Sequence, residues 1–312
     1  MAQPQHASGY GNELNIGLPP HAATKLLYDY RCYSRLAEGA SLDFELEAGT
    51  TLSNYSRAYY SRVGEVTEAD ADEGLNGVET LLEAKMETDF AEVCQDLNSV
   101  MKFNYSQACR MGKRWDDFSK AMEWGVTGWM DRRTSVFGYI KLAASAHANN
   151  IIGSVAAPLV VPMDRERTGT EVTLATVIRQ LHRRMNAAGA MCQPGDFKVF
   201  VPIEGYSAAT FEQKNLNVCC GMDNTLVTGK AYMVDGFTLI PDIWVPIAGY
   251  DAAGIPIYYV IMVRPDEVYF PIDICRVKWE ERGNDYYLYT TGFFGFKVAN
   301  PKAVAVAVVK FV

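Results

Sequence analysis

The sequence has little of what marks a nucleic-acid-binding, secreted or membrane protein. Its 29 lysines and arginines are outnumbered by 37 aspartates and glutamates, and the formal net charge is −8. Proteins that hold nucleic acid on their surface are usually basic, so this balance argues against a general nucleic-acid binder. No apolar run approaches the roughly 18 residues that a membrane span needs. The first residues lack the basic and apolar regions of a signal peptide, so we expect a protein that is made and used in a cytoplasm.

Motifs for enzyme chemistry are also missing. Neither GxGxxG nor GxxxxGK[ST] occurs, so the sequence has no motif for dinucleotide binding or for a P-loop. The 4 histidines are not spaced as metal ligands, and the 7 cysteines form no CxxC pair, which indicates reduced thiols rather than a disulfide framework. We therefore predict no catalytic residue, no cofactor and no metal, and hence no enzyme. The cysteines are Cys32, Cys94, Cys109, Cys192, Cys219, Cys220 and Cys275.

One enzymatic alternative stays open, a thiol hydrolase. Cys219 or Cys192 would be its nucleophile and His182 its base. The adjacent cysteines Cys219 and Cys220 cannot easily share a site, no pattern places a histidine beside them, and nothing suggests an oxyanion hole. A structural role is the favoured interpretation.

The N-terminal part of the chain has the composition of an extended region. Residues 1–24 are rich in Gly, Pro, Ala, Asn and Gln and cannot bury enough surface to fold alone, which leaves either a tail or an arm docked on a neighbour. Residues 41–47 alternate polar and apolar, and residues 52–63 can return as a second strand. Such a two-stranded ribbon is marginal by itself and needs a partner surface.

A long helix is predicted next. Apolar residues recur at three-to-four spacing over 70–103, and acids crowd the start of this segment, as expected for a helix of about 45 Å. Residues 104–142 predict shorter helical pieces, which three glycines interrupt. The large side chains of this second segment are interpreted as packing anchors: Trp115, Phe118, Met122, Trp124 and Trp129.

The second half of the chain predicts a mixed α/β region followed by strands. Thr173 caps an amphipathic helix that ends at 188–189, and a strand follows over 197–202. Asp235-Gly236 between two short apolar pieces is a strong hairpin signal, and Pro241 ends the second strand. Residues 255–312 predict only strands and turns.

Three stretches of this half carry a resemblance to a known family. The helix over 173–188 with GDFKVFVPIEGY (195–206), the pair TGKAYMVDGF (228–237), and FKVANPKAV (296–304) resemble, in this order, the central and C-terminal signatures of tailed-bacteriophage major capsid proteins. These proteins have the Hong Kong 97-type shell fold. The N-terminal half matches by element type.

The resemblance implies an α+β fold and a structural function, a coat subunit that self-assembles into the icosahedral shell around a double-stranded DNA genome. The shell would form from hexamers and pentamers in the host cytoplasm and would enclose DNA without sequence-specific binding. Its implied segments are an N-terminal arm (1–38), an extended-loop hairpin (39–66), a long spine helix with a peripheral domain (67–170), an axial domain (171–254) and C-terminal strands that complete both cores (255–312).

The subunit-interface residues expected on this basis are basic and aromatic. The extended loop would overlap an adjacent subunit with its arginines available for ion pairs. For the two arginine pairs, surface solubility or intersubunit salt bridges are favoured over phosphate binding. The set is Arg57, Tyr59, Tyr60, Arg62, Arg132, Arg133, Arg183 and Arg184.

Two departures from family patterns give further expectations. No lysine lies between Lys25 and Lys85, so we expect no lysine-dependent crosslink from the extended loop. Only a short arm precedes the fold, so we expect a separate scaffolding protein and no cleavage of the coat subunit. A portal and decoration or cement proteins are further implied partners. The nearest rival is an encapsulin-type nanocompartment, which has the same fold and a protein cargo.

Overall fold

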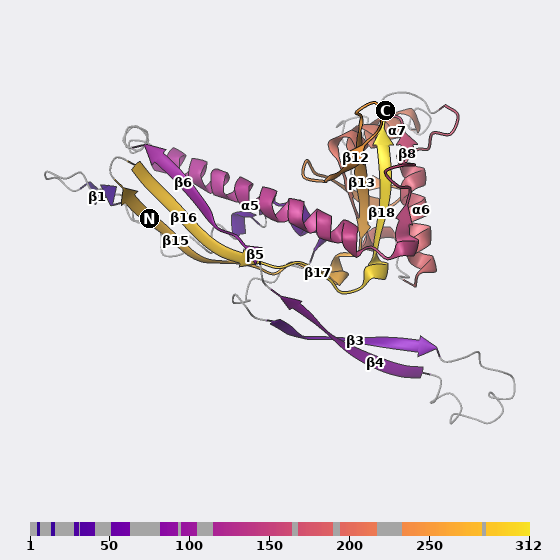
Figure 1. Cartoon of the computed structure of the whole chain (residues 1–312), viewed down its shortest axis with the longest axis horizontal. Coiled ribbons are helices and arrows are strands. Elements are labelled where there is room, and N and C mark those ends of the chain that lie inside the picture. The colour runs from indigo at the N-terminus through magenta and orange to yellow at the C-terminus, as the bar shows by residue number, and fades with distance from the viewer. Residues whose placement is uncertain are drawn as a thin grey trace.

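The computed structural model describes residues 5–6, 14–15, 28–30, 32–40, 51–62, 82–92, 95–104, 115–163, 168–189, 194–216, 233–282 and 285–312. Figure 1 shows three parts: a large sheet with two helices at one end, a long helix lying along a smaller sheet, and a separate two-stranded ribbon. This mixture of helices and sheets agrees with the predicted α+β class.

The large sheet has eight strands, in the order β10-β11-β9-β13-β18-β7, with β12 paired to β13 and β8 to β18. The central strands β13 and β18 pair antiparallel to each other. β9 pairs parallel with β11, and β18 pairs parallel with both β7 and β8. The bounds are β7 Ile151–Ile152, β8 Leu159–Val161, β9 Lys198–Val201, β10 Met233–Val234, β11 Phe237–Pro241, β12 Ile247–Tyr250, β13 Pro256–Val263 and β18 Val304–Phe311.

Both faces of this sheet are buried, which explains the nearly continuous apolar sequence of β18. Val304 and Val306 pack into one core, and Ala305 and Ala307 between them pack into another. Successive side chains of a strand point to opposite faces, so one strand serves both cores. The C-terminal strand is therefore tied into the centre of the sheet, as predicted.

Helices α6 (Leu174–Ala187) and α7 (Ile203–Leu216) belong to the second of these cores. The prediction for α6 is confirmed, since its cap Thr173 accepts a hydrogen bond from the backbone N–H of Thr176. One face of the helix is buried at three-to-four spacing, as an amphipathic helix requires. These buried residues are Leu174, Val177, Ile178, Leu181 and Met185.

The long helix is α5, Trp115–Ser145. Residues 104–142 were expected to form interrupted pieces, and this prediction is wrong for the described residues, because the glycines of α5 are contact points instead of breaks. A Cβ built at Gly125 would lie 2.6 Å from Met101 Cε, and one at Gly138 would lie 2.4 Å from Leu36 Cδ2. Of the predicted anchors, Trp129 does pack against the core.

The helix predicted over 70–103 is wrong where the structure describes it. That segment contains β4 (Leu82–Glu92), β5 (Gln95–Asp96) and β6 (Ser99–Asn104). The apolar residues of β4 are four apart, but four is also a multiple of two, and the sequence LEAKMETDFAE alternates as a strand does. Pairing with distant strands then decides the structure, because strand formation depends on tertiary context.

The extended ribbon exists, with a different partner from the predicted one. β3 (Thr51–Arg62) pairs antiparallel with β4, from Thr51 opposite Glu92 to Arg62 opposite Leu82. The strand predicted over 52–63 is therefore confirmed as β3, but its described partner is β4 rather than the predicted first strand over 41–47, which lies outside the described residues. The ribbon consequently reaches from residue 51 to residue 92.

A four-stranded sheet lies along α5 in Figure 1. Its order is β15-β16-β5, with β6 also paired to β16; β15 is Ile272–Arg282 and β16 is Asp285–Phe294. The smaller pairs are β1 (Gln5–His6) with β2 (Leu14–Asn15) and β14 (Val268–Tyr269) with β17 (Lys297–Val298). Single turns of 3-10 helix occur at Leu36–Gly39, Ala148–Asn150, Pro194–Asp196, Pro265–Glu267 and Pro301–Ala303.

The hairpin around residues 235–236 is confirmed. β10 and β11 pair antiparallel across Asp235 and Gly236, whose φ angles of 53° and 85° give the tight turn that suits twisted strands. Pro241 is the last residue of β11, so the predicted stop is also confirmed.

Candidate assembly surfaces

The four predicted interface residues of the extended loop all lie in β3. Arg57 is opposite Glu87 of β4, and Tyr59 is opposite Lys85. Tyr60 and Arg62 are opposite Ala84 and Leu82. The register therefore places all four residues within the paired length of the ribbon.

The predicted arginine pairs lie on two helices. Arg132 and Arg133 are exposed on α5, and the Arg132 guanidinium lies 5.6 Å from the centroid of the Trp244 ring, a cation–π distance. Arg183 and Arg184 are exposed on α6.

Arg184 has partners in its own chain. Its Nη1 donates to the carbonyl oxygens of Asn149 and Ile151 at 3.0 and 2.9 Å, which joins the end of α6 to the start of β7. A contact of any of these arginines with another subunit stays a prediction.

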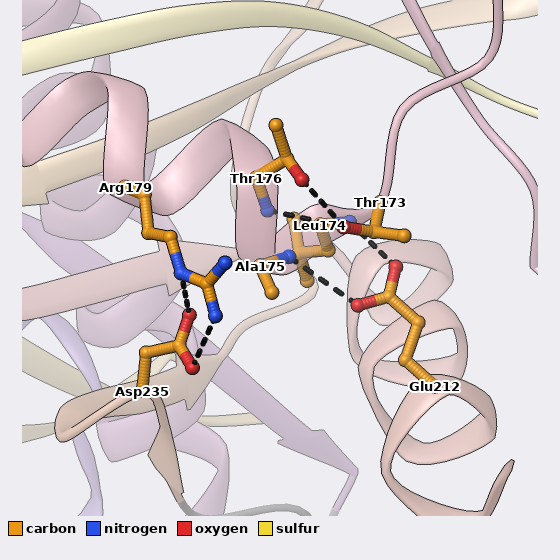
Figure 2. Close-up of polar contacts among 7 residues, drawn as sticks. All are labelled: Thr173, Leu174, Ala175, Thr176, Arg179, Glu212 and Asp235. Carbon is orange, nitrogen blue, oxygen red and sulfur yellow. Dashed lines mark hydrogen bonds and ion pairs between the residues drawn. The ribbon is translucent and has the colours of Figure 1, made fainter. Parts of the chain in front are cut away.

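The N-terminus of α6 is closed by a carboxylate from α7, as Figure 2 shows. Glu212 accepts from the backbone N–H groups of Leu174 and Ala175 at 2.5 and 3.3 Å. These are two of the donors that a helix start leaves unsatisfied, and the positive end of the helix dipole favours the negative charge. Burial nevertheless raises the pKa of Glu212, and the two N–H donors offset that rise only in part.

The β10–β11 turn is fixed to the same helix. Arg179 Nε lies 2.6 Å from Asp235 Oδ2, and Arg179 Nη2 donates to Asp235 Oδ1 at 3.0 Å, the two-point geometry drawn in Figure 2. The first turns of α6 thus orient both α7 and the hairpin.

A buried polar cluster joins α5 to the loop that follows β11. Tyr139 donates to Asp242 Oδ2 at 2.6 Å, and the Trp244 indole Nε1–H donates to Asp131 Oδ2 at 2.9 Å. Asp242 also accepts from the Trp244 backbone N–H, and Ser135 donates to Asp131 Oδ1 at 3.0 Å. Both aspartates are only 5% exposed. We call these five residues the buried junction.

Burial raises the pKa of Asp131 and of Asp242 above the ordinary value of 3.8, and the hydrogen bonds and the charge of Arg35 offset part of that rise. Burial together with the neighbouring Asp242 also raises the pKa of Tyr139, which keeps its phenol a donor. Sequence reasoning missed this cluster. Its one local signal is Asp242, whose carboxylate accepts a hydrogen bond from the backbone N–H two residues later in the chain, as aspartates in turns often do.

The part of the chain that the structure describes contains no group of three or more His, Cys, Asp or Glu that could hold a metal ion, and no helix in it is long and apolar enough to cross a membrane. His182 packs edge-on to Phe197 and Phe237, with ring centroids 5.5 and 5.0 Å away. Its suggested partners Cys192 and Cys219 lie outside the described residues.

Comparisons with known proteins identify the fold. No protein-family model and no curated protein matches the sequence. Three similar solved structures are "Capsid of Ralstonia phage GP4" (14% identity, 86% of each chain, TM-score 0.54), "Satellite phage P4 procapsid including size determination (Sid) protein" (10% identity, 95% of this chain and 94% of that chain, TM-score 0.58) and "Mycobacterium phage Ogopogo" (13% identity, 89% of this chain and 91% of that chain, TM-score 0.53).

This likeness covers nearly the whole of each chain. The fold is the Hong Kong 97-type capsid fold, which confirms the fold that the three sequence stretches imply.

Proposed function

We propose that this protein is the major capsid protein of a tailed bacteriophage. One observation carries the proposal: the arrangement of α5, the two sheets and the ribbon is similar over 86–95% of the chain to subunits of a phage capsid and a phage procapsid. A fold alone does not fix a function, so assembly of the purified protein is the test of the proposal.

The shape of the subunit supports assembly. A two-stranded ribbon is marginal when isolated, and Figure 1 shows β3 and β4 standing apart from the two larger sheets. Symmetric contacts in a closed shell give such a ribbon a neighbour to lie on. The β3–β4 ribbon and the exposed arginines of α5 and α6 are the surfaces proposed for those contacts.

We further propose partners for assembly. One similar structure is a procapsid that includes a size-determination protein, which supports partner-directed assembly here through a separate scaffolding protein. The further proposed partners are a portal and decoration proteins. The shell would enclose a double-stranded DNA genome without sequence-specific binding. The net charge of −8 is compatible with a shell subunit that encloses DNA without binding it tightly.

Electron microscopy of the purified protein, expressed alone and with its neighbouring gene products, tests this function. We expect closed angular shells, and double-stranded DNA in the native particle. Shells that hold a protein cargo instead would identify a nanocompartment. A monodisperse monomer or dimer under every condition would refute a shell protein, and thiol-dependent turnover would then be sought.

A further inference from the structure

The turn between β10 and β11 carries the single Asp-Gly pair of the sequence, Asp235-Gly236. Both residues are exposed, and the residues on either side, Val234 and Phe237, are buried and paired with each other. An Asp-Gly pair is chemically reactive, because glycine has no Cβ that would keep its amide nitrogen away from the preceding carboxyl group. The main chain of this turn can therefore react with its own side chain.

The reaction forms a cyclic imide and needs no co-reactant except water. The amide nitrogen of Gly236 bonds to Cγ of Asp235, and the bond from Cγ to one carboxyl oxygen breaks. That oxygen leaves as water with the amide proton and the carboxyl proton. Water then opens the ring at either carbonyl carbon. Opening at Cγ restores aspartate, and opening at the main-chain carbonyl gives isoaspartate, in which the main chain runs through Cγ.

Arg179 holds both oxygens of this carboxyl group in the folded protein. Its Nε lies 2.6 Å from Asp235 Oδ2 and its Nη2 donates to Oδ1 at 3.0 Å, so the side chain is directed toward α6, as Figure 2 shows. Attack on Cγ needs a carboxyl group that faces the main chain and an oxygen that can leave as water. The two-point ion pair opposes both requirements, because the group cannot rotate and neither oxygen can leave without breaking it.

Both partners of this ion pair are carried by elements with fixed positions. On one side, α6 buries Ile178, the residue before Arg179, and a carboxylate from α7 caps its first turn. On the other side, a Cβ built at Gly236 would lie 3.4 Å from Pro194 Cβ, so the turn packs against the segment before β9. Arg179 and Asp235 therefore meet through packed structure and not through two flexible side chains alone.

We propose that Asp235 is a site of spontaneous conversion to isoaspartate and that Arg179 protects it in the folded protein. An effect on overall stability is a weaker explanation of the ion pair, since the Arg179 side chain is 62% exposed and exposed pairs add little to stability. The protection concerns a chemical step at one residue. It is independent of whether the protein forms shells.

Conversion would change the hairpin itself. Isoaspartate adds a carbon to the main chain, and the tight turn that joins β10 to β11 cannot take it up while Val234 stays paired with Phe237. The carboxylate of isoaspartate is attached directly to Cα, so it is shorter than the aspartate side chain and loses the two-point contact with Arg179. The hairpin would then be released from α6.

Incubation in heavy-oxygen water measures the reaction at this residue. Each passage through the imide places a heavy oxygen at residue 235, even where aspartate is restored, and mass spectrometry with electron-transfer fragmentation locates the label and identifies isoaspartate. Folded wild type, folded Arg179→Met and urea-unfolded wild type are compared. We expect the unfolded chain to react fastest. Folded Arg179→Met should react about two- to fivefold faster than folded wild type, the ratio that corresponds to the loss of an exposed ion pair.

Two further variants separate the ion pair from the helix that carries it. Gln180→Met is the matched control, because it places the same side chain at the next exposed position of α6, and it should react at the wild-type rate. Arg179→Lys keeps the charge but lacks the planar fork that contacts both oxygens, so its rate should lie between those of wild type and Arg179→Met. Circular dichroism and the unfolding midpoint establish that each variant is folded.

Salt provides a test on the wild type alone. Added sodium chloride screens an exposed ion pair, so the folded protein should react faster and the unfolded chain at an unchanged rate. Equal rates for folded wild type and Arg179→Met, with a faster unfolded chain, would assign the protection to the backbone of the turn and overturn the role of Arg179. Equal rates for folded and unfolded wild type would overturn the protection altogether. No heavy oxygen at Asp235 in any sample would overturn the site.

Discussion

The phenol of Tyr139 donates a hydrogen bond of 2.6 Å to Asp242 Oδ2, although 103 residues separate the two in sequence. Tyr139 is fully buried in α5, and Asp242 begins the loop after β11 of the large sheet. The bond therefore joins the long helix to the sheet that α6 and α7 cover. A buried donor and a buried carboxylate are each costly without the other, so the pair fixes how the two parts meet.

Replacing Tyr139 with phenylalanine should weaken this junction. The variant keeps the ring, which packs edge-on to Phe200 at 5.0 Å, and loses the donor to a buried carboxylate. We expect the free energy of unfolding to fall by about 1–3 kcal/mol. Urea denaturation measures it, with Tyr250→Phe at a 63% exposed site as the control. Equal stabilities of the two variants would contradict the importance of the junction.

The junction also predicts how stability depends on pH. Burial raises the pKa of Asp242 in the folded protein above 3.8. Between pH 3.8 and the folded-state pKa, the folded state therefore binds more protons at this carboxyl than the unfolded state does. Its contribution to stability is greatest below about pH 4 and decreases as the pH rises through the folded-state pKa. The Asp131 carboxyl, also raised by burial, acts in the same direction.

Asp242→Asn removes this titration. The unfolding free energy of the wild type minus that of the variant should decrease from pH 4 to pH 7, because the contribution of Asp242 decreases over this range. Asp251→Asn is a control with the opposite pH trend. The hydrogen bond from Lys310 lowers the pKa of Asp251, so the contribution of Asp251 to stability is lost as the pH falls. Parallel pH profiles for wild type and Asp242→Asn would show that burial does not shift this carboxyl.

Two glycines of α5 should respond in opposite ways to alanine. A Cβ at Gly138 would lie 2.4 Å from Leu36 Cδ2 and 3.1 Å from Phe296 Cε2, whereas one at Gly128 would meet nothing within 4 Å. We expect Gly138→Ala to destabilise by about 1–3 kcal/mol through overpacking. Gly128→Ala should stabilise by about 0.5–1 kcal/mol through helix propensity. Thermal unfolding compares them, and a stabilising Gly138→Ala would refute the close packing.

The carboxylate cap of α6 gives a graded prediction. Glu212→Ala leaves the N–H groups of Leu174 and Ala175 without their acceptor and should cost about 1–2 kcal/mol. Glu212→Gln keeps one acceptor oxygen and loses the charge, so its cost should be smaller. Chemical denaturation followed by far-UV circular dichroism measures both. The interpretation as a cap fails if glutamine and alanine cost the same.

The sequence by itself determined the elements whose signals are local. Thr173 with its apolar stripe specified α6, Asp235-Gly236 specified the hairpin turn, and the apolar residues of 304–311 specified a strand. These signals depend on backbone geometry and burial within a few residues. The resemblance of residues 173–304 to phage coat proteins likewise led to the correct fold.

Only the tertiary structure decided the first half of the chain. The residues of β4 fit a helix and a strand equally by spacing, and the pairing with β3 selects the strand. The glycines of α5 are breaks in isolation and become contact points only where Leu36 and Met101 approach. The buried junction joins residues about a hundred positions apart, so no local pattern contains it. Long-range pairing and packing outweigh local propensity in these places, because burial supplies more free energy than the conformational preference of single residues.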